Sequence, residues 1–300
     1  MKTFTCPNCG GELRPGGAGA LTCAYCGTKT YLSDRELREY GTFREAVLQS
    51  LGAAANDESR RKLDRLWDGA ESVALARRTG GPLKIRYLFR GTQDGVEIYT
   101  ARQNAVFVLS PEGADRFAET AASLSFPAAD VQGLAAYFPT VTGRFELADG
   151  RVALSVAKAE GLFPLSAFGS LPPAHAAWIV SRLENLCCAL TFSDLSHGGI
   201  GAESVFIDPA THEAFLLGGW WNARRTDGGS RADLLAVRKT AARVMGDALP
   251  DAPAQFRAFI NGAPMADAYA DFAAWDRVIE EGFGGRRFRT LDLTQLKTES

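Results

Sequence analysis

Two stretches of the sequence decide how the rest of the chain is interpreted. Residues 196–208 read S-H-G-G-I-G-A-E-S-V-F-I-D, which is a histidine in a glycine-rich loop followed by an apolar segment. Residues 215–221 read F-L-L-G-G-W-W, an apolar segment that runs into two glycines and two tryptophans. Short apolar runs bounded by turn residues are typical of buried strands. Both stretches therefore predict a short strand that adjoins a glycine-containing loop.

The first stretch resembles the catalytic loop of protein kinases, which reads H-R-D-L-x-x-x-N before an apolar strand. His197 matches the histidine, and residues 205–207 match the strand. Gly199 stands at the position of the catalytic aspartate, and Ser204 at that of the Mg²⁺-binding asparagine. In the second stretch, Gly218 stands where D-F-G has its metal-binding aspartate. The resemblance implies a kinase-like fold in which the chemical groups have been replaced.

The order of the other elements supports this resemblance, which covers roughly residues 80–285. The third strand of the expected N-terminal lobe ends at Leu109 and contains no lysine for the phosphates. Glu119 corresponds in position to the αC glutamate, on a helix that Ser110 and Pro111 begin. The other elements expected in this lobe are a strand at 83–89, its turn at 91–95, a returning strand at 96–101, and a hairpin of 141–147 with 151–157.

The C-terminal lobe is expected to begin after a hinge at 158–162. A long helix from Pro172 to Phe192 leads into the His197 loop, as in kinases. Cys187 and Cys188 lie on it and are predicted to be core thiols, because adjacent helical positions point about 100° apart and cannot share a site. The predicted fold class is α+β, a two-lobed kinase-like fold with lobes at about 80–158 and 162–285. Further helices are expected at 231–245, 253–260 and 266–281, before a polar tail at 286–300.

The replaced groups argue against phosphoryl transfer. That reaction needs a lysine on the third strand, the loop aspartate and two ligands for Mg²⁺. Removing one preorganised contact of this kind typically costs about 3–4 kcal/mol in the barrier. We therefore expect a pseudokinase that is not an enzyme, in which His197 is structural. Trp220 and Trp221 either fill the nucleotide pocket or lie in the core or on the surface. Asp194 and Asp208 are the nearest aspartates, and neither occupies a motif position.

The N-terminal segment contains four of the six cysteines, in two C-x-x-C-G knuckles. Four thiolates at this spacing favour a tetrahedral Zn²⁺ site, and a closed four-cysteine site is structural. A short hairpin can form between the two pairs, and metal binding should stabilise a module this small. Two disulfides are the alternative, which the absence of a signal peptide disfavours. Residues 1–32 are predicted to be a zinc ribbon with one structural Zn²⁺ bound by Cys6, Cys9, Cys23 and Cys26.

Residues 33–79 are expected to be a helical connector. Residues 33–36 read S-D-R-E, a capping box that begins one helix. Apolar residues at steps of three and four predict a second helix that extends to Val73. The pair either packs on the following domain or offers a surface to a partner.

Composition sets few limits on function. The hydrophobic content is 46%, the charged content 23% and the net charge −2, as in an ordinary soluble protein. No apolar run is long enough to span a membrane, and the N-terminus lacks an apolar signal region, so we expect a cytoplasmic protein that does not bind membranes.

Three functions remain open from the sequence. The first is a protein-binding scaffold or regulator, with the zinc ribbon as a second docking module and another protein as partner. The second is a nucleic-acid-binding protein led by the ribbon, to which a basic strand face of Lys84, Arg86 and Arg90 could add. The third is an atypical nucleotidyl or phosphoryl transferase with displaced catalytic residues.

Overall fold

The computed structural model describes residues 61–126, 132–209, 211–226 and 231–285, the single residues 291 and 296, and the backbone of three short strands near the N-terminus. The chain divides into two compact units, residues 1–70 with 286–288 and residues 71–285 with 289–300. Among the described residues, no helix combines the length and the apolarity needed to cross a lipid bilayer.

The first unit contains a three-stranded antiparallel sheet in the order β1-β2-β3. β1 (Leu13–Pro15) pairs with β2 (Ala20–Cys23), which pairs with β3 (Lys29–Tyr31). β1 and β2 pair between Cys9 and Cys23, and Cys23 is the last residue of β2, so the hairpin expected there is confirmed. Residues 61–68 are helical, whereas residues 33–60 of the predicted connector lie outside the described residues.

The end of the connector differs from the expectation. The apolar pattern placed Val73 on the second helix, but Glu71–Leu75 form a strand, β4. Val73 and Leu75 are partly covered while Ser72 and Ala74 are exposed, which is the alternation of a strand. A single apolar residue such as Val73 fits both the helical and the strand period, so the pattern could not locate the boundary.

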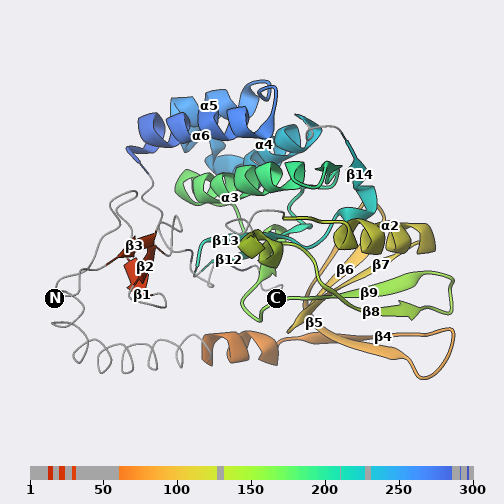
Figure 1. Cartoon of the computed structure of the whole chain (residues 1–300). Helices are drawn as coiled ribbons and strands as arrows, with labels where there is room; N and C mark the ends of the chain where they lie inside the picture. Colours follow the sequence, from red (N-terminus) through yellow and green to blue (C-terminus); the bar gives the residue numbers. More distant parts are fainter. Residues whose placement is uncertain are drawn as a thin grey trace. The chain divides into compact units, whose positions relative to one another are not determined.

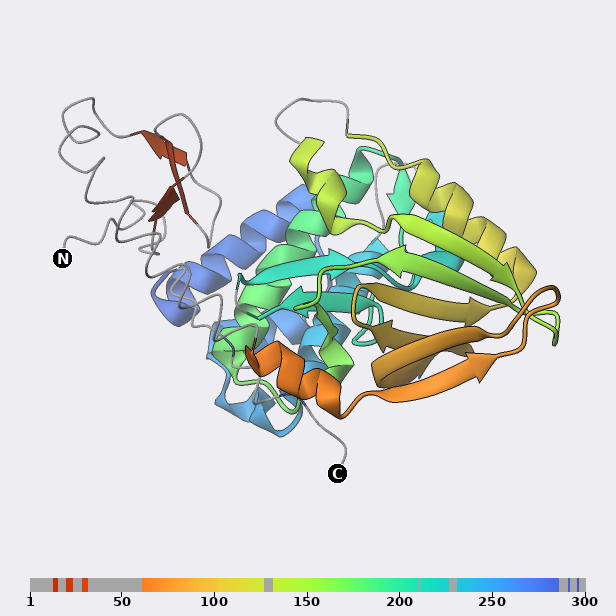
Figure 2. The same ribbon diagram turned by 90° about the horizontal axis from the view of Figure 1, so that it is seen from below.

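The second unit begins with a six-stranded antiparallel sheet in the order β4-β5-β6-β7-β9-β8. The two edge strands meet at one end, where Arg77 pairs with Leu147 and the Arg78 amide donates to the Glu146 carbonyl at 2.9 Å. Figure 2 shows the hairpins of β4 with β5 and of β8 with β9 converging there. The remaining strands are β5 (Leu83–Gln93), β6 (Val96–Ala101), β7 (Asn104–Leu109), β8 (Val141–Glu146) and β9 (Val152–Ala157).

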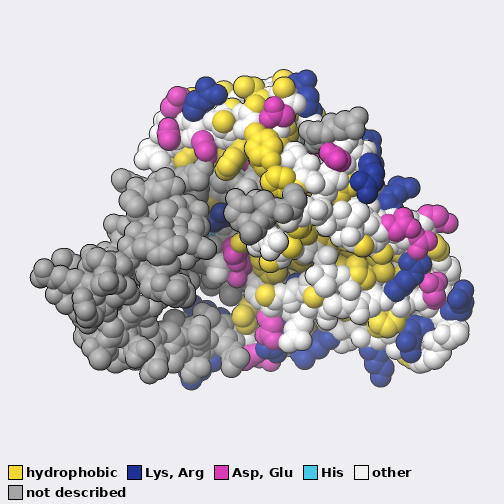
Figure 3. All heavy atoms as spheres, viewed as in Figure 1, with side chains coloured by type: hydrophobic (Ala, Val, Ile, Leu, Met, Phe, Trp, Pro, Cys, Tyr) yellow, Lys and Arg dark blue, Asp and Glu magenta, His cyan; other side chains and the backbone are white. Residues whose placement is uncertain are grey.

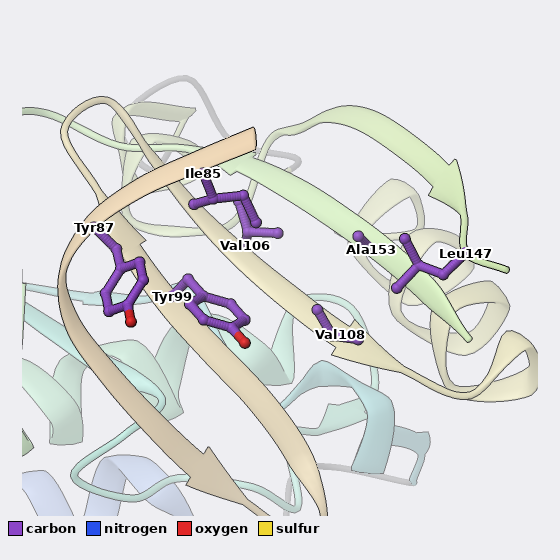
Figure 4. Packing of buried hydrophobic residues seen from close by; sticks show 7 residues of the cluster. All are labelled: Ile85, Tyr87, Tyr99, Val106, Val108, Leu147 and Ala153. Carbon is purple, nitrogen blue, oxygen red and sulfur yellow. The ribbon is translucent and has the colours of Figure 1, made fainter. Parts of the chain in front are cut away.

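Each face of the curled sheet has its own apolar core. One face carries a buried cluster, drawn in Figure 4, which consists of Ile85, Tyr87, Tyr99, Val106, Val108, Leu147 and Ala153. On the other face, Phe107 of β7 packs against Phe117 of helix α2 (Pro111–Ala122), with ring centroids 5.6 Å apart. Ser110 caps α2 as expected, since its hydroxyl accepts from the Gly113 amide at 3.1 Å. β7 is therefore buried on both faces.

Strand β5 differs from the prediction in two places. A bulge between Tyr87 and Phe89 shifts the register, so Arg90 lies opposite Tyr99 and donates to Glu97 at 2.7 Å. Arg90 thus leaves the face that it was expected to share with Lys84 and Arg86. The strand also continues through the expected turn at 91–95. Only Asp94 and Gly95 turn, with φ of 52° and 80°, as a two-residue type I′ turn requires.

The second half of this unit is mainly helical (Figure 1). α3 (Pro173–Thr191) packs against α4 (Arg231–Met245) and α6 (Ala268–Phe283), and Cys187 and Cys188 are buried on it as predicted. β12 (Val205–Asp208) and β13 (Glu213–Leu216) form the short hairpin after the His197 loop. The other elements are η2 (Gln132–Tyr137), β10 (Phe163–Pro164), η3 (Leu165–Ala167), β11 (Leu195–Ser196), η4 (Trp220–Asn222), β14 (Arg224–Arg225), η5 (Gly246–Asp251) and α5 (Ala254–Asn261).

The predicted fold class, α+β with a sheet part followed by a helical part, is confirmed. The elements follow the order that the kinase resemblance implied, from hairpin, third strand and helix to long helix, loop and short hairpin. β4 is an additional strand that the sequence did not predict.

Candidate functional site

Hydrogen bonds to the first turn of α4 hold the loop that contains His197. The Asp233 carboxylate accepts hydrogen bonds from the backbone amides of His197 and Gly198, both at 2.8 Å. Asp233 is almost fully buried, so these charge-assisted bonds compensate its lost hydration. Gly198 has a φ of 68°, and a Cβ there would lie 2.8 Å from the Asn222 carbonyl oxygen. Gly198 is therefore required by the conformation of the loop.

His197 links the two stretches on which the sequence analysis began. Its Nε2 lies 2.9 Å from the Gly218 carbonyl oxygen, and its Nδ1 accepts from the Gly199 amide at 3.2 Å. Because Nδ1 accepts a hydrogen bond, it carries no proton in the neutral ring. The ring proton is therefore on Nε2, which donates to the Gly218 carbonyl. Burial lowers the pKa of His197 from 6.5 to about 4, although nearby Asp233 favours the charged form. His197 is thus a neutral ring that hydrogen-bonds to both loops.

Ser204 stands at the sequence position of the Mg²⁺-binding asparagine of kinases, but its hydroxyl forms hydrogen bonds within the loop. Ser204 Oγ donates to the Gly199 carbonyl at 2.6 Å and accepts from the Gly201 amide at 2.9 Å. The side chain is fully buried. The hydroxyl satisfies two backbone groups of the loop, so its role here is structural.

The two loops meet backbone to backbone at Gly199 and Gly219. A Cβ on Gly199 would lie 2.6 Å from the Gly219 carbonyl oxygen, and one on Gly219 would lie 2.6 Å from the Gly199 carbonyl oxygen. Carbon and oxygen cannot approach this closely without a shift of the backbone. The packing therefore excludes an aspartate at position 199, where kinases have their catalytic base.

The position of the metal-binding aspartate is closed as well. A Cβ on Gly218 would lie 3.0 Å from Phe107 Cε1 and 3.1 Å from the Ser204 Cα. Phe107 is fully buried, and its ring contacts Trp221 at a centroid distance of 5.7 Å. The Phe107 ring thus packs against the backbone at position 218, which corresponds to the metal-binding aspartate of the kinase motif.

Both tryptophans of the second stretch belong to the core. Trp221 stacks on Phe117 of α2 at 6.4 Å, and its carbonyl accepts from Arg116. Trp220 lies edge to face with His197 at 4.6 Å, and its indole donates to the Leu216 carbonyl. Of the alternatives raised by the sequence, core filling holds for both.

The sheet contributes apolar groups to this site where kinases contribute charges. β7 contains no lysine, and Leu109 at its end is buried. Glu119 is exposed, whereas Ala114 and Phe117 are the buried residues of α2, so Glu119 does not occupy the inward position expected of an αC glutamate. Lys158 begins the segment predicted to be the hinge, and its ammonium donates to the carbonyls of Arg102 and Ala159. Burial lowers its pKa to about 7.

The tip of the β5–β6 hairpin is fastened to both loops. Gln93 Nε2 donates to the Gly199 carbonyl at 2.9 Å, and Asn222 Nδ2 donates to the Asp94 carboxylate at 2.8 Å. These contacts hold the tip of the hairpin against Gly199 and Asn222. No local sequence pattern indicated these contacts, because they join residues more than a hundred positions apart in the chain.

The structure brings together His197, Gly199, Ser204 and Gly218, as the sequence predicted. Asp194 and Asp208 are placed elsewhere. Asp194 lies in the turn after α3 with a φ of 50°, and its carbonyl accepts from the Thr226 amide. Asp208 ends β12 and accepts from the Thr211 amide at 3.3 Å. Asp233 was missed, although an acidic residue in the first turn of a predicted helix was a visible signal.

The zinc prediction lies largely outside the described residues. Of the four cysteines, only Cys23 is described, as the last residue of β2. Among the described residues, no group of three or more histidine, cysteine or acidic side chains could hold a metal ion.

Comparisons with known proteins give likenesses to solved structures only. No family model matches the chain, and no curated protein does. Among solved structures, vaccinia related kinase 3 is similar to it, with 14% sequence identity and a TM-score of 0.43, over 74% of this chain and 82% of the other.

Proposed function

We propose that this protein is a catalytically inactive, kinase-like protein that acts by binding other proteins, as a scaffold or regulator. The observation that carries the proposal is the contact between Gly199 and Gly219, which leaves no room for a side chain at either position. An active site that had lost its aspartate by a single substitution would keep the space for it. Here the backbone itself occupies that space.

The surroundings of this contact support the same conclusion. Phosphoryl transfer depends on charged groups that position the phosphates and two metal ligands. In this chain the matching positions carry glycine, serine and apolar side chains, and Phe107 lies against Gly218. A triphosphate entering such a region would have its charges uncompensated, which is unfavourable. Binding of another macromolecule on the outer surface needs none of these groups.

Phosphoryl transfer can be tested directly. Zinc-loaded full-length protein is incubated with γ-labelled ATP and Mg²⁺ or Mn²⁺, with generic protein substrates present and an active kinase in parallel. We expect no label on the protein or the substrates above that of a heat-denatured sample. Metal-dependent transfer that is lost in a folded Asp194→Asn or Asp208→Asn variant would instead support the enzyme with displaced catalytic residues.

We also propose that residues 1–32 form a zinc ribbon that serves as a second docking module. Thiolates of Cys6, Cys9, Cys23 and Cys26 would hold one Zn²⁺, whose role is to stabilise the fold of the module. Elemental analysis of protein purified without added metal should give about one zinc per chain. The Cys6→Ser/Cys23→Ser variant should lose this zinc and keep the unfolding transition of the larger unit. Zinc retained by that variant contradicts the assignment.

A further inference from the structure

Two leucines near the C-terminus are buried, although the sequence predicted a polar tail there. Leu291 and Leu296 expose only 2% and 6% of their surface. Figure 3 shows that other hydrophobic side chains remain at the surface of the helical half, and Leu235 on α4 is one of the exposed ones. A chain end is ordered only where contacts hold it, so the two buried leucines indicate such contacts.

Each leucine is held at a different place on the second unit. The Leu291 amide donates to the carbonyl of Pro209, the residue after β12, at 3.4 Å. Leu296 forms an isolated antiparallel bridge with Phe168, which follows η3 in an extended conformation with φ of −92° and ψ of 153°. Phe168 and Pro209 are buried as well. The leucines thus dock on two separate segments of the same unit.

The spacing of the leucines indicates two separate anchors. They are five positions apart, which would place them on opposite faces of a regular strand and about 140° apart on a helix. One apolar face of a helix or strand therefore cannot supply both side chains. The backbone contacts that the described residues give them are the bond to Pro209 and the bridge to Phe168. Burial of the two side chains is therefore the main contribution to docking.

Docking of this kind is reversible. Burying two leucine side chains is favourable, but it requires ordering the backbone of a chain end, and the two contributions are of similar size. Gly284 and Gly285 end α6 with φ of 68° and 107°, and Leu291 comes six positions after Gly285. So short a tether keeps the leucines at a high effective concentration near their contacts. They can therefore leave and return in a local opening, without unfolding of the unit.

We propose that this place is a peptide-binding site, which the chain's own C-terminal leucines occupy until a segment of a partner protein displaces them. We name it the tail site, and it consists of Phe168 and Pro209 with Leu291 and Leu296 docked on them. The partner segment that fits it carries two leucines five positions apart and a backbone amide that donates to Pro209. The proposal rests on the proposed function, because it specifies one surface of a binding protein and how access to it is regulated.

The probe is a fluorescently labelled peptide with the sequence of residues 286–300. Its binding is measured by anisotropy on the zinc-loaded full-length protein and on the Leu291→Ser/Leu296→Ser variant, whose leucines no longer compete. We expect the variant to bind the peptide at least about tenfold more tightly than the parent, because only the undocked fraction of the parent can bind it. A peptide with the same two substitutions should bind neither protein. Leu235→Ser, which alters an exposed leucine, is the matched control and should bind as the parent does.

Hydrogen exchange in the parent protein tests the reversibility without a substitution. The Leu291 amide should exchange by local opening, at a rate that low urea concentrations do not change. The amide of Val237, buried within α4, should exchange only on unfolding of the unit, and urea should accelerate it.

A Leu291 amide that exchanges only together with Val237 would make the leucines a permanent part of the core and contradict the tail site. Equal binding of the peptide by the parent and the variant, or binding by neither, contradicts it too. So does a Leu291→Ser/Leu296→Ser variant that fails to fold. None of these results changes the outcome of the ATP-labelling assay, so the two proposals fail separately.

Discussion

The helical half contains two regions with buried ionisable side chains, around His197 and around Glu184. The two regions differ in how these side chains are accommodated. In the first region, the buried side chains of His197, Asp233 and Ser204 have hydrogen-bond partners, since Asp233 accepts two amides and Ser204 bonds two backbone groups. Between α3, α4 and α6, Arg238 pairs with Asp271 at 2.8 Å, and Glu184 is buried beside them. Neither carboxyl oxygen of Glu184 has a hydrogen-bond partner at normal distance among the described residues.

In each region, burial shifts the pKa of one side chain so that this side chain is neutral at pH 7. Burial lowers the pKa of His197 to about 4, so the loop is braced by a neutral ring with two hydrogen bonds. Burial, with the nearby Asp271 carboxylate, raises the pKa of Glu184 to about 9, so this acid is held protonated. The two regions should therefore lose stability at opposite ends of the pH range.

The largest effect is expected at Asp233. Asp233→Ala leaves the buried amide of His197 and the partly buried amide of Gly198 without an acceptor, and a buried unsatisfied group costs about 1–3 kcal/mol. We expect the free energy of unfolding to fall by about 2–4 kcal/mol. Urea unfolding followed by tryptophan fluorescence measures it. Asp247→Ala, an exposed aspartate of the helical half, is the control, and a loss no larger than that of the control contradicts the role of Asp233.

The pH dependence of stability tests the His197 brace. The pKa is about 6.5 when the chain is unfolded and about 4 when it is folded, so the unfolded state binds the proton first as the pH falls. Stability present above pH 6.5 should be lost between about 6.5 and 4, by on the order of 3 kcal/mol. His197→Gln should be less stable at neutral pH but should flatten this part of the curve. An unchanged slope in the variant would assign the loss to other groups.

A substitution at Gly199 tests the contact between the loops. Gly199→Ala places a Cβ 2.6 Å from the Gly219 carbonyl oxygen, and overpacking of this kind costs about 1–3 kcal/mol. Gly201→Ala in the same loop is the matched control, because its Cβ would lie 3.7 Å from the flexible Gln93 side chain. Thermal unfolding of both variants should separate them. Equal midpoints would mean that the loops do not touch as described.

Glu184 should give the smallest of these effects when the effect is measured as the change in stability over one pH unit. Its pKa is about 9 in the folded chain against 4.5 in the unfolded chain, so the folded state retains the proton and stability is lost as the pH rises between these values. Glu184→Gln cannot ionise and should remove a slope of up to about 1.4 kcal/mol per pH unit. Unfolding at pH 6 and pH 7 measures this slope, with exposed Glu281→Gln as control. A slope that persists in Glu184→Gln would show that another group titrates.

The sequence predicted the fold best where local chemistry decides the structure. The Ser110 cap, the hairpin turn at Asp149 and Gly150, and the α4 helix follow from short-range preferences. The bulge at Tyr87 and Phe89 was missed because it depends on the partner strand, and β4 because Val73 suits both periods. At the site, the motif positions 197, 199, 204 and 218 were found from their spacing. Asp233, Phe107 and Gln93 reach the site only through the tertiary fold, so no local pattern identified them.

Thermal unfolding in the presence of Mg-ATP tests most directly the claim that the loops and Phe107 leave no nucleotide site. Ligand at a hundred times its dissociation constant stabilises a protein by about 2.7 kcal/mol, which shifts the midpoint of a domain of this size by several degrees. We predict that millimolar Mg-ATP leaves the midpoint unchanged, while an active kinase in the same assay shifts clearly. A metal-dependent increase of several degrees in the full-length protein would contradict the account.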